Sequence, residues 1–177
     1  LDIIPEISYT PENMTLTNDT SVVDWLPVNI GGPILTWSIS PQLSEGLEFN
    51  ESTGHITGMP TEVTSLRTYL VTATNSGGSA TTLINITVLD QVPMVAYAPD
   101  EVILLNNSTV LTMEAIMTGG AVTSWSIVPD LSAGLFFDTT NGALSGVATQ
   151  VQGRTMYAIT ASNDVGSITV FVNITIE

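Results

Sequence analysis

The sequence predicts an all-β protein built from two tandem copies of one small antiparallel β-sandwich. Two observations lead to this prediction. A segment of 88 residues occurs twice in succession without a gap, and about 33 of the 88 aligned positions are identical. Within each copy, apolar and polar residues alternate with a period of two, as they do in half-buried β-strands, and helical spacing is not found.

The repeat divides the chain into a first domain at residues 1–88 and a second domain at residues 89–177. Each copy has a usual length for an independently folding domain. The chain starts at a repeat boundary, so we expect it to be a segment of a longer array. The repeated positions are mainly glycine, aromatic and asparagine residues, among them Gly31, Gly32, Trp37, Gly54, Tyr69, Asn75 and Asn85, and their equivalents Gly119, Gly120, Trp125, Gly142, Tyr157, Asn163 and Asn173.

The alternation indicates about seven strands in each copy. In the first copy, residues 69–73 and 84–88 are expected to form a long hairpin around the turn at 75–78. Trp37 and Ile39 mark a central strand that follows a Gly-Gly pair. The remaining expected strands lie near residues 5–10, 14–17, 21–28, 47–49 and 56. Seven short alternating strands are typical of a two-sheet antiparallel sandwich.

Charge excludes some classes of partner. Seventeen acidic residues oppose two arginines, no lysine is present, and the formal net charge is −15. Nucleic acid is therefore excluded as a partner, because almost nothing could neutralise phosphates. No apolar run approaches the roughly 18 residues of a membrane span, so direct membrane insertion is not expected. An acidic protein of this kind suits a saline or calcium-rich exterior, and we expect an extracellular, cell-surface location.

Several spaced motifs resemble a known family. They are TWSISP at 36–41, GLEFN at 46–50, TGHITGMPT at 53–61 and TATNSGGS at 72–79. These stretches resemble the tandem immunoglobulin-like repeats of large prokaryotic surface proteins, and they are also similar to dystroglycan-type cadherin-like domains. The resemblance implies two Ig-like or cadherin-like sandwiches. Such domains serve as spacers, adhesins and enzyme appendages, so the resemblance leaves the function open.

The resemblance to cadherin-like domains also implies a calcium site. In that family, carboxylates precede a proline at the domain junction, as Asp90 does here. Asn75 and Asn163 occupy the hairpin position of an Ala-x-Asp ligand motif, while Glu12 and Asp100 each follow a proline near the entry strands. The alternative interpretation is that the asparagines accept a positive φ in a turn and that the acids are solvated.

Three further residues are candidates for surface functions. Asn85 and Asn173 begin Asn-x-Ser/Thr sequons on the expected outer face of the last strand, and they are either glycosylated or polar edge residues. Phe136 is expected to point outward and to contact a partner, because Leu135 and Phe137 on either side of it point inward. The repeated tryptophans are expected in the core.

Catalysis has little support in the sequence. The chain has one histidine, His55, which alanine replaces in the second copy, and it has no cysteine or lysine that could serve as a nucleophile. No histidine pair could hold zinc. We therefore expect a protein that is not an enzyme and that has no cofactor other than the calcium considered above.

The leading functional hypothesis is a structural or adhesive spacer in a larger multi-repeat cell-surface protein. Its partners would be neighbouring repeats of the same polypeptide. Residues 89–92 contain no glycine or serine run, so the two domains are expected to form an extended, stiff rod. The alternative is a module that binds a cell-surface glycan or protein, with or without calcium. A third hypothesis is an accessory segment of an enzyme.

Overall fold

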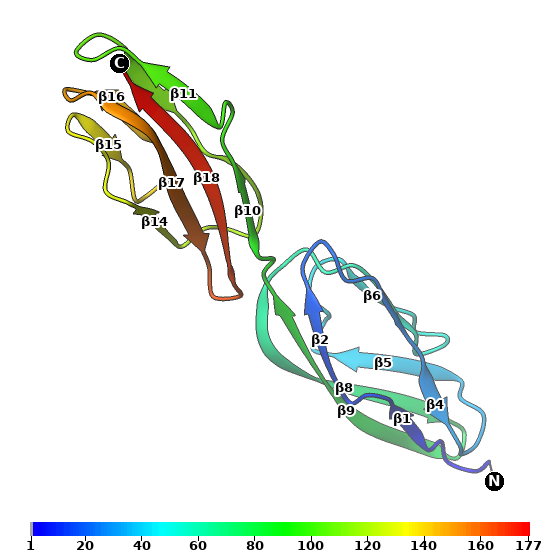
Figure 1. Cartoon of the computed structure of the whole chain (residues 1–177). Coiled ribbons are helices and arrows are strands. Elements are labelled where there is room, and N and C mark those ends of the chain that lie inside the picture. Colours follow the sequence, from blue (N-terminus) through cyan, green and yellow to red (C-terminus); the bar gives the residue numbers. More distant parts are fainter. Residues whose placement is uncertain (1) are drawn as a thin grey trace. The chain divides into compact units, whose positions relative to one another are not determined.

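The computed structural model describes residues 2–177, and Leu1, where the predicted first domain begins, lies outside the described residues. The chain forms two compact units, Leu1–Asp90 and Gln91–Glu177, each of which is described by itself (Figure 1). Every regular element within residues 2–177 is a β-strand, so the all-β prediction is confirmed. In this range there is no helix that could span a membrane.

The first unit consists of three small sheets. A four-stranded sheet has the order β2-β9-β8-β5, a three-stranded sheet has the order β3-β7-β6, and β1 pairs with β4. The pairing of β2 with β9 is parallel. The strands are β1 Ile7–Tyr9, β2 Asn13–Thr17, β3 Val23–Trp25, β4 Pro27–Asn29, β5 Thr36–Ser40, β6 Leu47–Phe49, β7 Ile56–Gly58, β8 Thr64–Asn75 and β9 Gly78–Leu89.

The second unit repeats this topology. Its sheets have the orders β11-β18-β17-β14, β12-β16-β15 and β10-β13, and β11 is parallel to β18. The strands are β10 Pro93–Ala96, β11 Glu101–Leu104, β12 Val110–Met113, β13 Ile116–Gly119, β14 Ser124–Val128, β15 Leu135–Phe137, β16 Leu144–Val147, β17 Gln152–Ser162 and β18 Ser167–Ile176.

The long hairpin of each unit carries the predicted alternation. In Figure 1, the hairpin strands β8, β9, β17 and β18 are the longest arrows. The inward side chains are all at most 1% exposed. They are Tyr69, Val71, Ala73, Ile84, Ile86 and Val88 in the first unit and Tyr157, Ile159, Ala161, Val172, Ile174 and Ile176 in the second. The period-two prediction for both hairpins is therefore confirmed.

The expected strand at residues 21–28 is in fact two strands. β3 pairs with β7, whereas β4 pairs with β1, so the chain changes sheet at Leu26. Val23 and Trp25 point into the core, and Leu26 is exposed where the chain leaves that sheet. Because of this split, the described residues 2–177 form nine strands in each unit instead of about seven, within the predicted sandwich.

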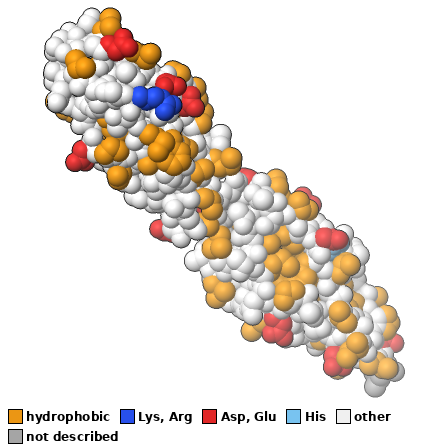
Figure 2. All heavy atoms as spheres, in the orientation of Figure 1, with side chains coloured by type: hydrophobic (Ala, Val, Ile, Leu, Met, Phe, Trp, Pro, Cys, Tyr) orange, Lys and Arg blue, Asp and Glu red, His pale blue; other side chains and the backbone are white. Residues whose placement is uncertain are grey.

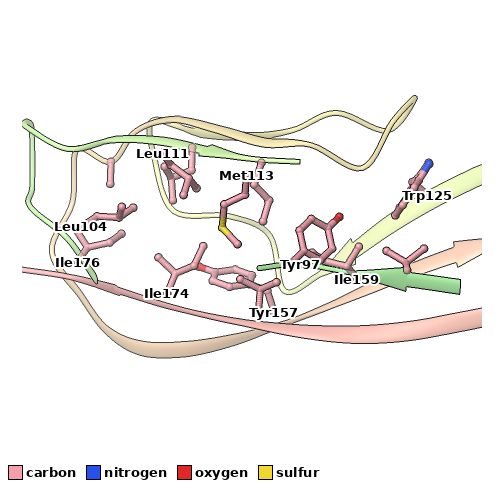
Figure 3. Packing of buried hydrophobic residues seen from close by; sticks show 14 of the residues in the cluster. Tyr97, Leu104, Leu111, Met113, Trp125, Tyr157, Ile159, Ile174 and Ile176 are labelled. Carbon is pink, nitrogen blue, oxygen red and sulfur yellow. The ribbon is translucent and has the colours of Figure 1, made fainter. Parts of the chain in front are cut away.

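The tryptophan of the central strand is buried in each core, and the first unit buries Trp25 as well. Figure 3 shows Trp125 and the two tyrosines Tyr97 and Tyr157 among aliphatic side chains from both layers of the second unit. Gly142 lies against the indole, because a Cβ atom there would be 2.6 Å from the ring, and its φ is +76°. The first unit repeats the contact between Gly54 and Trp37. The predicted core positions of both repeated tryptophans are confirmed.

Candidate functional site

Asn75 lies at the tight turn between β8 and β9 and is only 7% exposed. Its side-chain Nδ2 donates hydrogen bonds to the carbonyl oxygens of Ile3 at 2.7 Å and Pro33 at 3.0 Å. Its Oδ1 accepts from the backbone N–H groups of Gly77 and Gly78. We call Asn75, and its equivalent Asn163, the amide clamp of its unit. The clamp ties the entering chain to the hairpin turn.

Asn163 makes the same type of contacts in the second unit. Nδ2 donates to the carbonyl oxygen of Gln91 at 2.6 Å, and Oδ1 accepts from the N–H groups of Val165 and Gly166. Gly120 makes room for the clamp, since a Cβ atom there would lie 1.9 Å from the Gln91 oxygen and 2.8 Å from Asn163 Nδ2. The Gly-Gly motif before the central strand is therefore needed for close backbone approach.

This geometry explains why both clamp residues are asparagine. An aspartate at Asn75 could not donate to Ile3 and Pro33, whereas an amide provides both donors and an acceptor. The amide oxygen already accepts two hydrogen bonds, so it offers no lone pair to a cation. Neither asparagine has a positive φ, so the asparagines are not the positive-φ residues of their turns. Calcium binding stays a prediction.

Glu12 and Asp100 lie far from the clamp of their own unit, whereas Asp90 directly precedes Gln91, whose carbonyl Asn163 holds. The carbonyl oxygen of Glu12 accepts from the Asn85 N–H, and Asn85 is seven residues along β9 from the turn. At about 3.3 Å per residue, this places Glu12 roughly 23 Å from the clamp. In the second unit, the carbonyl oxygen of Asp100 likewise accepts a hydrogen bond from the Asn173 N–H, seven residues along β18 from Gly166 in the Asn163 turn. Neither acid can share one ion with the asparagine of its unit.

Asp90 follows the end of β9, at the opposite end of this strand from the Asn75 turn. The predicted ligands are thus not brought together within either unit, because the length of each hairpin separates them. Among residues 2–177, no group of three or more histidine, cysteine, aspartate or glutamate side chains is placed to hold a metal ion.

The two candidate glycosylation sites lie on the outer faces of central strands. Asn85 on β9 is half-buried; its Nδ2 donates to Asn13 Oδ1 at 2.8 Å and its Oδ1 accepts from Thr68 Oγ1 at 2.6 Å. Asn173 lies between the buried residues Val172 and Ile174 on β18 and is also half-buried. Their glycosylation stays a prediction.

Two buried tyrosine hydroxyls bond to the glycines beside the tryptophans. Tyr9 donates to the Gly54 carbonyl oxygen, and Tyr97 donates to the Gly142 carbonyl oxygen at 2.5 Å. Burial raises the pKa of Tyr97 to about 12 and raises that of Tyr9 as well. The sequence shows that both tyrosines repeat, but it does not reveal the partners of their hydroxyls.

Phe136 on β15 is 66% exposed. The equivalent residue in the first unit is Glu48, which lines a hollow of about 540 Å³. Ile39, Leu43, Leu47 and Phe49 line its apolar part, and Gln42, Glu48 and Glu51 line its polar part. The sequence does not reveal this hollow, because its residues come from separate strands and loops. The role of Phe136 in partner contact stays a prediction.

The remaining charged contacts lie at the surface. His55 Nε2 is 2.5 Å from Asp24 Oδ1, and Arg154 Nε donates to Glu101 Oε1 at 2.7 Å. Figure 2 shows acidic side chains scattered over the visible face and basic atoms in one small area beside acidic atoms. The strongly acidic surface favours cationic partners over anionic ones.

Comparison with known proteins identifies the fold of the first unit. Residues 5–89 match the family described as "Putative Ig domain" (He_PIG). The second unit repeats this sequence and topology. No protein with a curated description matches the chain in sequence.

Solved structures with a similar fold contain Ig-like domains. The insect immune protein hemolin is similar with a TM-score of 0.62 and 15% identity over 98% of this chain and 47% of that one. An E-to-A variant of titin domains I67–I69 is similar with a TM-score of 0.54 and 21% identity, over 99% of this chain and 66% of the titin chain. The extracellular domains 3–5 of Drosophila OTK are similar with a TM-score of 0.51 and 19% identity, over 97% of this chain and 62% of the OTK chain. The chain thus spans about half of the hemolin structure and under two thirds of the OTK structure. These similarities show the fold alone.

Proposed function

We propose that this pair of Ig-like domains is an extracellular spacer segment that carries mechanical load within a larger multi-repeat cell-surface protein. Ig-like domains are typical of adhesion and structural repeats in multi-domain proteins and are typically not enzymes. The acidic composition fits a saline exterior. The partners of the segment would be neighbouring repeats, and the proposal requires neither a catalytic group nor a bound metal.

The observation that carries the proposal is the parallel pairing near the two ends of each unit. Residues 13–17 of β2 pair in parallel with residues 85–89 of β9, and β11 pairs in the same way with the end of β18. Tension on the chain pulls the two strands of such a pair in opposite directions along their axes. The hydrogen bonds between them are then loaded together instead of one after another, so they resist rupture jointly.

The chain between the units supports a stiff connection. β9 ends at Leu89, the carbonyl of Gln91 is held by Asn163, and β10 begins at Pro93. Asp90 is thus the one residue between the end of β9 and Gln91, whose carbonyl oxygen Asn163 holds. A connection this short leaves little of the freedom of a Gly/Ser linker.

Small-angle scattering tests the spacer role on the two-unit chain. A strand of 12 residues at about 3.3 Å per residue is roughly 40 Å long, so an extended pair should reach on the order of 80 Å. A matched control variant carries eight Gly/Ser residues inserted after Asp90 and should give a broader distribution of distances. A maximum dimension near that of one unit would contradict the proposal.

A further inference from the structure

We infer that the hollow between β5 and β6 of the first unit binds an extended, lysine- or arginine-containing segment of a partner protein. This inference goes beyond the spacer function. We call the hollow the edge groove, defined by Ile39, Gln42, Leu43, Leu47, Glu48, Phe49 and Glu51. Its volume of about 540 Å³ is within the roughly 300–1,000 Å³ of ligand sites.

The edge groove lies where both sheets of the sandwich end. β5 is the last strand of the four-stranded sheet, and β6 is the last strand of the three-stranded sheet. The Trp37 N–H points away from β8 and donates to the Glu51 carbonyl oxygen at 3.0 Å. Because alternate residues of a strand direct their backbone groups to the same side, the N–H and C=O of Ile39 also face away from β8. Glu51 already occupies the edge at Trp37, so an extended segment could pair with the backbone of β5 at Ile39.

The side chains of the edge groove determine which segment fits. Ile39 and Phe49 are half-buried, and Leu43 and Leu47 are buried, so the floor is apolar. Glu48 and Glu51 are exposed at the rim, and no lining residue is basic. A strand with alternating apolar and basic side chains would place one set on the floor and the other beside the carboxylates. A sugar is a poorer fit, because the floor is mostly aliphatic and offers no exposed tryptophan or tyrosine for stacking.

The second unit differs at the rim. Its floor keeps Ile127, Leu131, Leu135 and Phe137 at the equivalent positions, whereas Phe136 replaces Glu48, Thr139 replaces Glu51 and Asp130 replaces Gln42. The first unit therefore combines an apolar floor with two carboxylates, Glu48 and Glu51, whereas the second has neither of these and carries a single acid, Asp130, at a different position. This difference makes the second unit an internal comparison for a binding experiment.

The test uses the full two-unit chain and a fluorescein-labelled, end-capped octapeptide of alternating valine and lysine. We expect saturable binding, measured by fluorescence anisotropy, that weakens at least tenfold in the double variant Glu48→Gln/Glu51→Gln. The matched control Glu12→Gln/Glu62→Gln removes the same charge from exposed positions elsewhere and should change the Kd less than twofold. A lysine–glycine octapeptide of equal charge should bind at least tenfold more weakly, since it has nothing to place on the apolar floor.

Amide NMR on the unaltered chain provides a second measurement. The largest peptide-induced shifts should fall on Ile39 and the rim residues of the first unit, with the equivalent positions of the second unit unchanged. Equal weakening in both double variants, equal affinity for both lysine peptides, or shifts spread over all acidic residues would overturn the inference, because each indicates charge attraction without a site. Binding of neutral oligosaccharides with shifts at the same residues would overturn it in favour of a glycan site.

Discussion

At the residue scale, Asn75 shows how one side chain can join three parts of a domain. Its amide bonds to the entry segment at Ile3, to the loop before the central strand at Pro33 and to the hairpin turn at Gly77 and Gly78. These contacts require two donors and one acceptor in a nearly buried place. Only an amide provides both, which is why a carboxylate cannot replace it.

Asn75→Asp should therefore destabilise the first unit by about 2–3 kcal/mol, because the Ile3 and Pro33 carbonyls lose their donor and face a carboxylate. Urea unfolding measures the change. Asn50→Asp is the matched control, since the second unit has Asp138 at this position with similar turn hydrogen bonds, and it should change stability little. Millimolar calcium should leave the melting temperature of the wild type and of Asn75→Asp unchanged. A calcium-dependent rise in the wild type would contradict the clamp and support a metal site.

The buried tyrosine hydroxyls should make the free energy of unfolding fall at high pH. Burial raises the pKa of Tyr97 to about 12 from an ordinary value of 10, so the folded state favours the neutral phenol. The raised pKa of Tyr97 contributes fully to the free energy of unfolding below pH 10. This contribution is lost as the pH rises to about 12, and the free energy of unfolding falls by at most about 1.4 kcal/mol per pH unit. The chain has no lysine or cysteine that would titrate there as well.

Urea unfolding between pH 9 and 11.5 tests this expectation, with Tyr97→Phe as the comparison. The variant should lose about 1–2 kcal/mol at neutral pH, because the Gly142 carbonyl loses its donor. Its stability should then fall less steeply above pH 10. Identical slopes for the variant and the wild type would show that Tyr97 ionises freely in the folded state.

At the element scale, each unit depends on a contact between a turn and the central strand. Gly142 precedes β16, and its α-carbon lies against the ring of Trp125 on β14. The turn can approach the indole this closely because glycine has no side chain and accepts a φ of +76°. The same arrangement of Gly54 and Trp37 shows that the sandwich uses this contact in both copies.

Gly142→Ala should destabilise the second unit by about 2–3 kcal/mol, because the new methyl group would overlap the Trp125 ring in a conformation that alanine rarely adopts. Thermal unfolding followed by tryptophan fluorescence measures the effect. Gly153→Ala is the matched control, because nothing lies within 4 Å of a Cβ atom at this position on β17. Similar losses for both variants would indicate a general effect of removing glycine and not the contact with Trp125.

At the scale of the whole molecule, two similar units share one design and differ in the length of their parallel pairing. Five residue pairs join β2 and β9 in the first unit, and four join β11 and β18 in the second. If this pairing carries the load, the number of bonds broken together should influence the rupture force.

Single-molecule stretching should therefore show two unfolding events, with the second unit unfolding at the lower force. A flexible insertion after the exposed residue Glu62 lengthens the first unit and assigns each event by its contour length. Leu16→Ala should lower the free energy of unfolding of the first unit by about 2–5 kcal/mol, because Leu16 is buried on β2. Thermal unfolding measures this change. The opposite order of events in the chain with only the insertion would contradict the role of the parallel pairing.

Much of the fold could be predicted because the sandwich follows from local alternation. The inward faces of both hairpins, the core tryptophans and the outward Phe136 all depend on period two along a single strand. The split of residues 21–28 could not be predicted, because the change of sheet at Leu26 depends on which strands pair with β3 and β4.

Two copies of one acidic, all-β unit can be recognised from the linear chain alone, because repetition, alternation and composition are properties of the sequence. The roles of single polar residues, in contrast, depend on contacts made in the folded chain. Asn75 binds backbone groups 72 and 42 residues away, and the edge groove joins β5 to β6 and to the loops that follow them. Hydrogen bonds and hollows of this kind depend on distances in space, which spacing along the chain does not specify.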